Sequence, residues 1–114
     1  MDRQEKFVEG GSIPEEVVGK GVSRRVLGHD DQLMMIQVRF EKGGVGSLHR
    51  HPHRQVSYVA AGKFSATIGG EERVLNAGDS FFVPPDTEHG VVALEAGVLI
   101  DVFAPAREDF LPRT

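Results

Sequence analysis

The chain carries Gly-Gly-Val-Gly-Ser-Leu-His-Arg-His-Pro-His-Arg-Gln at residues 43–55, and Gly-Asp-Ser-Phe-Phe-Val-Pro-Pro-Asp-Thr-Glu-His at residues 78–89. Residues two positions apart on an extended chain share a face, so His49 and His51 point the same way and Gln55 can join them. A pair of strands could bring His89 opposite them, and neutral imidazole is the commonest side-chain metal ligand. Taken alone, the three histidines of the first stretch, His49, His51 and His53, could equally form a polar edge or an adventitious metal patch.

Short runs of β-branched and aromatic residues recur along the chain, with turn residues between them. These runs lie at residues 22–27, 33–40, 56–61, 63–68, 72–75, 80–83, 90–94 and 98–103. Strands spaced roughly 8–12 residues apart are typical of a sandwich or barrel, so the pattern predicts an all-β fold. Gly69-Gly70 suits a two-residue hairpin connection, because glycine accepts positive φ. Turns are also expected at Ala61-Gly62 and from Glu95 to Gly97.

Composition excludes several classes of function. The chain has 114 residues, a net charge of −4 and no cysteine. A mildly acidic chain argues against nucleic-acid binding and against a polybasic membrane anchor. The absence of cysteine excludes disulfides and thiolate metal sites. The start is charged, and no run approaches the roughly 18 apolar residues of a membrane span, so we expect a cytoplasmic protein with no membrane contact.

The last apolar run contains one charged residue, Asp101. A period of two places Leu99, Asp101 and Phe103 on one face of a strand. If that face looks into a barrel, Asp101 reaches the metal cavity as a candidate general acid or base. If it faces solvent or pairs with an arginine, its role is structural. Arg107 follows shortly after, and its planar guanidinium suits a carboxylate partner.

The two quoted stretches resemble the two sequence motifs of the cupin superfamily. The matching positions are Gly43, His49, His51, Gln55 in the usual glutamate position, Gly62, Gly78, Pro84 and His89. This resemblance covers residues 43–93. It implies a single-domain cupin, which is a double-stranded β-helix or jelly-roll barrel with a metal held inside by both motifs.

Three departures from the cupin pattern bear on the site. Asp86 and Ala93 replace the usual glycine and asparagine and are expected to be structural. Gln55 replaces a charged ligand by a neutral one, so the ion would keep its full charge for substrate, and the analogy with redox cupins is weaker. His53 is surplus to the motif and is left open between a supporting residue, a solvated residue and a direct ligand.

Residues 45–59, Glu88-His89-Gly90 and residues 101–111 sharpen this resemblance to the KdgF-type cupins, which spans about residues 20–111. That family acts in pectin and alginate breakdown. It converts 4,5-unsaturated monouronates to linear keto-uronates by ring opening and tautomerisation. The resemblance implies a metal-dependent isomerase whose metal ligands are His49, His51, Gln55 and His89. It also implies a catalytic group of Asp101, Phe103 and Arg107.

The expected cofactor is one divalent transition metal ion, and nitrogen-rich ligation suits Zn, Ni, Co, Fe or Mn. The expected partners are a small sugar-acid substrate and a second copy of the chain, in a homodimer to which residues 1–27 contribute. One domain is expected over residues 1–114, with an arm over 1–20, a barrel over about 22–103 and a tail over 104–114. Two alternatives stay open: a redox cupin of the dioxygenase type, and a non-catalytic cupin that binds a sugar acid.

Overall fold

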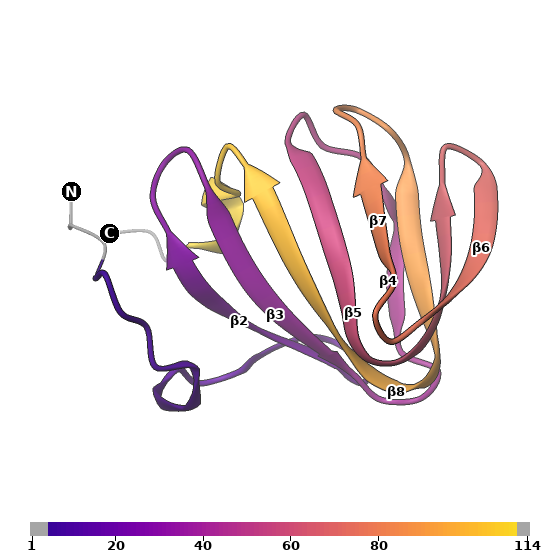
Figure 1. Ribbon diagram of the computed structural model, residues 1–114, viewed down its shortest axis with the longest axis horizontal. Coiled ribbons are helices and arrows are strands. Elements are labelled where there is room, and N and C mark those ends of the chain that lie inside the picture. The colour runs from indigo at the N-terminus through magenta and orange to yellow at the C-terminus, as the bar shows by residue number, and fades with distance from the viewer. Residues whose placement is uncertain (1–4, 112–114) are drawn as a thin grey trace.

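Eight strands and two short 3-10 turns make up residues 5–111, the part of the chain that the computed structural model describes (Figure 1). The elements are η1 (Gly10–Ser12), β1 (Glu16–Gly19), β2 (Val22–His29), β3 (Met34–Phe40), β4 (Val45–His49), β5 (Arg54–Ile68), β6 (Glu71–Asn76), β7 (Ser80–Val83), β8 (His89–Ala104) and η2 (Glu108–Phe110). Every strand pairing is antiparallel, so the predicted all-β class is confirmed.

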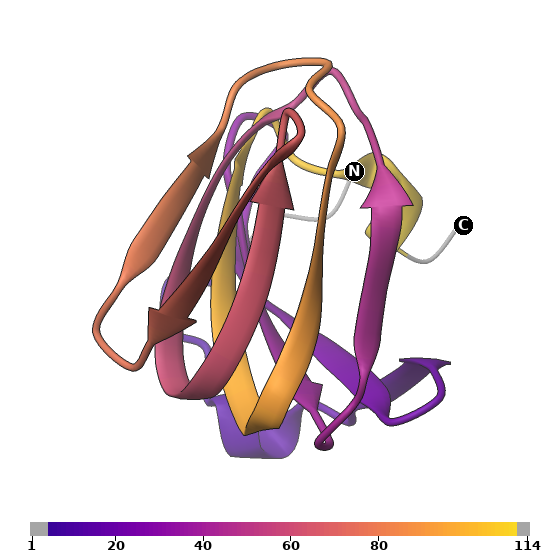
Figure 2. The same ribbon diagram turned by 90° about the vertical axis from the view of Figure 1, so that its right-hand side faces the viewer.

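The two long strands, β5 and β8, pair along most of their length and belong to two layers at once. The first half of β5 pairs with β7 and its second half with β6. The second half of β8 pairs with β3, which continues the sheet to β2 and β1, whereas its first half pairs with β4. Both strands bend where the layers meet, and the turned view shows β4 beside the first half of β8, at the edge of the second layer (Figures 1 and 2).

Close backbone contact at the bend requires glycine. Gly62 on β5 has φ of 86°, and a Cβ there would lie 2.5 Å from the carbonyl oxygen of Ala96 on β8. The register between β5 and β8 shifts at this point. The turns expected at Ala61-Gly62 and at Glu95 to Gly97 were therefore wrong, because the chain bends there through bulges without leaving either strand. The hairpin at Gly69-Gly70 is confirmed, since both residues have positive φ and Ile68 pairs with Glu71.

Alternating side chains of the central strands fill the space between the layers. On β8, every second residue from Gly97 to Phe103 is buried. This inward face carries Asp101 between Leu99 and Phe103, as the period of two predicted. On β3, Met34, Ile36, Val38 and Phe40 are buried in the same way. The polar site thus lies at one end of an apolar core. Among residues 5–111, no helix is long and apolar enough to cross a membrane.

Candidate metal centre

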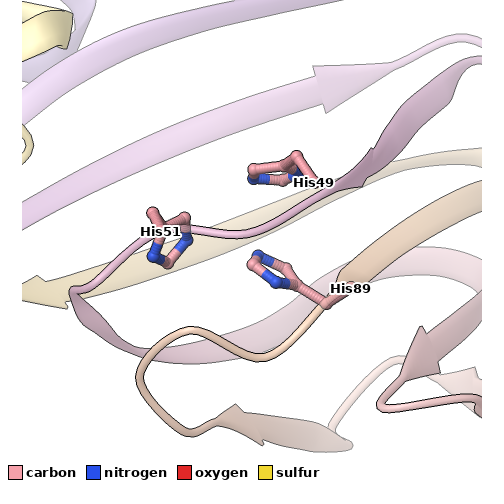
Figure 3. Close-up of side chains that lie close together, drawn as sticks. All are labelled: His49, His51 and His89. Carbon is pink, nitrogen blue, oxygen red and sulfur yellow. The ribbon is translucent and has the colours of Figure 1, made fainter.

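Three histidines from different elements meet at the mouth of the space between the layers. His49 ends β4 and His89 begins β8, and the two are direct partners in the antiparallel pairing. His51 comes from the link between β4 and β5. The three rings turn toward one another, and one ligand atom from each lies within 4.8 Å of the others (Figure 3). This group could bind a metal ion.

A backbone carbonyl orients each imidazole through the same ring atom. The Nδ1 distances are 2.8 Å from His49 to the Ser47 oxygen, 3.1 Å from His51 to the His53 oxygen and 2.8 Å from His89 to the Thr87 oxygen. Since a carbonyl only accepts, each Nδ1 carries the proton and donates it. In the neutral rings, each Nε2 therefore presents a lone pair.

Gln55 brings a fourth lone pair to the same point. Its Oε1 lies 3.0 Å from His51 Nε2 and 3.1 Å from His89 Nε2. Its amide nitrogen donates a hydrogen bond to Ser57 Oγ at 2.9 Å, which assigns the oxygen to the side of the histidines. No proton is available between these facing acceptors, so the arrangement fits a cation that all of them can approach.

Burial keeps the two inner imidazoles neutral. His51 and His89 are 6% and 3% exposed. Burial lowers the pKa of His89 to about 4. Burial, followed by the positive charge of Arg107, also lowers the pKa of His51. Neutral imidazole is the form that binds metal, so both rings are available at neutral pH.

Asp101 lies on the inward face of β8 and is connected to the histidine cluster through Ser57. The Ser57 hydroxyl donates to Asp101 Oδ1 at 2.6 Å. Burial raises the pKa of the Asp101 carboxyl to about 6, although the Ser57 hydrogen bond and the charge of Arg107 act in the opposite direction. A carboxyl with this pKa can take and return a proton near neutral pH.

Aromatic and cationic groups form the other wall of the site. The Phe103 ring lies edge-on to His51, with their centroids 5.7 Å apart. The Arg107 guanidinium lies 5.4 Å from the Phe103 centroid and 4.2 Å from that of Phe110. Its Nε and Nη2 atoms donate to the two carboxylate oxygens of Asp109, at 3.1 and 2.9 Å. One side of the arginine fork is therefore already occupied.

Most of these groups line one cavity of about 800 Å³. The two layers both contribute to its lining, which includes Ile36, His49, Gln55, His89, Leu99, Asp101, Phe103 and Arg107. Its volume falls within the range of pockets that hold small ligands. Apolar walls with a few converging polar groups are also typical of such pockets.

The structure brings all seven predicted site residues to this region and adds three that sequence reasoning missed: Ser57, Arg24 and Asp109. Arg24 lines the cavity and stacks on Phe110 at 3.9 Å. The signal for Ser57 was its spacing, because it lies two residues after Gln55 on the same inward face. His53 is outside the three-histidine group, and its backbone carbonyl orients His51.

A small antiparallel β-barrel with imidazoles converging at its mouth defines the cupin class of proteins. The cupin domain family model matches residues 36–103. The pectin degradation protein KdgF of Dickeya dadantii (strain 3937) is 48% identical over 100 residues, which cover 86% of this chain and 91% of that protein. The chain therefore belongs to the cupin family and, within it, to the KdgF-type proteins.

Two solved structures agree with this assignment. An RmlC-like cupin from Shewanella frigidimarina NCIMB 400 superimposes with a TM-score of 0.92 at 48% identity, covering 95% of this chain and 98% of that one. KdgF from Halomonas sp. gives a TM-score of 0.90 at 38% identity, covering 94% and 99%. Similarity of this extent includes the strands that carry the histidines and Asp101.

Proposed function

We propose that this protein is a metal-dependent isomerase that converts 4,5-unsaturated monouronates, released from pectin or alginate, to linear keto-uronates. The observation that carries the proposal is the buried Asp101, which lines the same cavity as His49 and His89 of the three-histidine group. The similarity to a pectin degradation protein supports the substrate class. The cavity volume of about 800 Å³ suits a single sugar acid.

The proposed ligands of one divalent transition ion are His49, His51, Gln55 and His89. These are four neutral donors, and nitrogen-rich ligation suits Zn, Ni, Co, Fe or Mn. When bound, such an ion supplies Lewis acidity toward the oxyanion charge that develops during ring opening. Gln55 contributes an uncharged oxygen, so the protein itself leaves the positive charge at the site uncompensated.

The proposed reaction needs one proton removed and one proton added. Asp101 takes the proton of the anomeric hydroxyl, the bond between C1 and the ring oxygen breaks, and C1 becomes an aldehyde. The electron pair of the broken bond stays on the ring oxygen as an enolate across C5 and C4. Protonation of C4 then gives the ketone at C5, and Asp101 can return the same proton. No redox partner is required, because the product is an isomer of the substrate.

The proposed partner of the substrate carboxylate is Arg107. Asp109 occupies its Nε and Nη2 atoms, so a second carboxylate would meet the guanidinium from the Nη1 side. Phe103 supplies an apolar wall between the histidines and this arginine. Asp109 also fixes the plane of the guanidinium, which orients the remaining donors.

The test follows the conjugated C4=C5 bond of an unsaturated monouronate, whose ultraviolet absorbance disappears in the reaction. We expect metal-reconstituted protein to accelerate this loss above the spontaneous rate. Asp101→Asn keeps the size and an acceptor oxygen but should lower turnover about 10²–10⁴-fold. Wild-type rates in metal-replete Asp101→Asn would remove the proton-transfer role. No acceleration with galacturonate- or mannuronate-derived substrate would favour a sugar-acid-binding cupin, and substrate-dependent oxygen uptake would favour a redox cupin.

We also propose a single cupin domain with the arm, barrel and tail given above, acting in the cytoplasm. Residues 16–19 of the proposed arm form β1 at the edge of the sheet. The first four residues of the arm and the last three of the tail lie outside the described residues.

A further inference from the structure

Ser57 lies between the two halves of the site and contacts both. It is 0% exposed, on the inward face of β5, and opposite Asp101 in the strand register. Its Oγ accepts the amide hydrogen bond of Gln55 at 2.9 Å and donates to Asp101 Oδ1 at 2.6 Å. A hydroxyl has one proton, so donation to Asp101 leaves only lone pairs to face Gln55.

This direction decides which end of the Gln55 amide faces the histidines. Because Ser57 accepts, it selects the NH2 end of Gln55, and the carbonyl oxygen must point to His51 and His89. If the amide were reversed, its NH2 group would donate to the imidazole lone pairs and take the place of a cation. Among residues 5–111, Ser57 is the only hydrogen-bond partner of the Gln55 amide nitrogen, so it alone fixes the orientation of the amide.

We propose that Ser57 is a positioning residue that turns the Gln55 carbonyl toward the histidine cluster and, through the same hydroxyl, holds Asp101 Oδ1. The remaining oxygen, Oδ2, is then the atom that exchanges protons. The part that concerns Asp101 rests on the proposed function, whereas the part that concerns Gln55 rests only on the metal site. Ser57 touches neither the proposed ion nor the proposed substrate and acts through its two neighbours, Gln55 and Asp101.

The first experiment titrates metal-free Ser57→Ala with Co²⁺ alone and records the visible spectrum. Groups that orient metal ligands are typically worth about 10–100-fold in metal affinity or activity. We expect Co²⁺ to bind Ser57→Ala about 10–100-fold more weakly and with an altered spectrum. The matched control is Ser65→Ala on the same strand, which removes a hydroxyl that donates to exposed Glu72. It should bind Co²⁺ as the wild type does.

A second pair of variants tests the same series of hydrogen bonds from the Asp101 side. This test does not require Ser57→Ala to fold. Asp101→Asn keeps an oxygen that accepts from Ser57, whereas Asp101→Ala removes it, and both lose the same charge. We expect Asp101→Asn to keep the wild-type Co²⁺ spectrum and Asp101→Ala to change it, although Asp101 is not a ligand. Identical Co²⁺ affinity and spectrum in these two variants would overturn the coupling.

The activity arm separates positioning from simple support of the fold. With unsaturated monouronate and full metal loading, Ser57→Ala should lower kcat about 10–100-fold while KM changes less than about threefold. In the Asp101→Asn background, Ser57→Ala should lower kcat by a smaller factor than in the wild type, because part of its effect passes through Asp101. Wild-type Co²⁺ binding and kcat in Ser57→Ala would refute the proposal. An inactive wild type would reject the isomerase while leaving the Co²⁺ result to decide on Ser57.

Discussion

Three imidazole nitrogens and one amide oxygen face a common point because each side chain is fixed from behind. Backbone carbonyls hold the Nδ1 atoms, and Ser57 holds the amide of Gln55. Neighbouring acceptors with no proton between them repel one another, and a cation removes that repulsion. A bound metal should therefore also stabilise the folded protein, because a ligand that binds only the folded state raises the free energy of unfolding.

Loss of two histidines should remove the metal while leaving the barrel folded. In a His51→Ala/His89→Ala double variant, we expect the metal content after gel filtration to fall far below one ion per chain. His53→Ala should retain near-stoichiometric metal, because the His53 ring packs edge-on against His51 without joining the three-histidine group, and its backbone carbonyl remains to orient His51. Elemental analysis measures both, with circular dichroism to confirm the fold. Full metal occupancy in the double variant would refute the ligand set.

Asp101 should make the metal-free protein less stable as the pH rises. Its pKa is raised from 3.8 to about 6 in the folded state, so the folded protein binds this proton more tightly than the unfolded chain does. Stability is then fully present below the unfolded pKa and is lost as pH rises through the folded pKa. Between about pH 4 and pH 7, the free energy of unfolding of the wild type should fall by about 2 kcal/mol relative to Asp101→Asn.

Urea unfolding in the presence of a chelator measures this difference. The histidines, Arg107 and Asp109 are the same in both proteins, so their contributions largely cancel in the comparison. A difference between the two proteins that does not change with pH would contradict the raised pKa of Asp101.

Site residues that lie close together in the sequence could be predicted from their spacing. Contacts between residues far apart in the sequence could not. The spacing of His49 and His51 predicts that they share a strand face, and Asp101 is the one charged residue in an apolar run. The spacing places Ser57 on the same face as Gln55 but does not reveal its hydrogen bond to Asp101, because serine is ordinary in a strand and this partner is 44 positions away. The occupied fork of Arg107 was also hidden, since nothing in the sequence distinguishes Asp109 from a solvated carboxylate.

At the level of elements, the sequence predicted where strands lie better than where they end. Four predicted runs proved to be halves of two continuous strands, β5 and β8. Glycine is a turn signal in most contexts, but at Gly62 it lets two backbones approach inside a sheet. The strand β4 was not among the predicted runs, because it is short and interrupted by Gly46, Ser47 and His49.

Gly62 should be among the least replaceable positions of β5. Gly62→Ala places a Cβ 2.5 Å from the Ala96 carbonyl oxygen at a φ of 86°, so the bend must distort. Strain of this kind costs about 1–3 kcal/mol before any clash is counted. The matched control is Gly28→Ala on β2, where a Cβ meets nothing within 4 Å. Chemical denaturation should show a lower midpoint for Gly62→Ala and little change for Gly28→Ala.

On the scale of the whole molecule, the outer face of the larger layer is unusually apolar. Phe82, Val56, Val102 and Met35 form one row across four strands through their registered pairs. Phe82 is 52% exposed and Val56 46%. Exposed apolar side chains that gather in one patch are typical of association surfaces. The row gives the predicted homodimer a candidate interface.

Phe82→Glu should therefore weaken the dimer. A charge in an apolar interface loses hydration without gaining a partner. Light scattering should give about twice the chain mass of 12.4 kDa for the wild type and a shift toward one chain mass for Phe82→Glu. Val74→Glu is the control, because Val74 is similarly exposed on β6, outside the row. A monomeric wild type at micromolar concentration would exclude a stable dimer.

The position of β8 near the end of the sequence also decides when the site can form during protein synthesis. His49 and His51 are synthesised well before His89, and protein synthesis proceeds at roughly 5–20 residues per second. For a few seconds, His49 and His51 exist without His89, and β3, β4 and β5 lack β8, the strand with which all three pair. Translation must pass residue 89 before three imidazoles can meet, and residue 101 before the buried carboxyl joins them. Any binding of metal at this group would thus be a late event in synthesis, and a product that ends before β8 would lack the third histidine of the group.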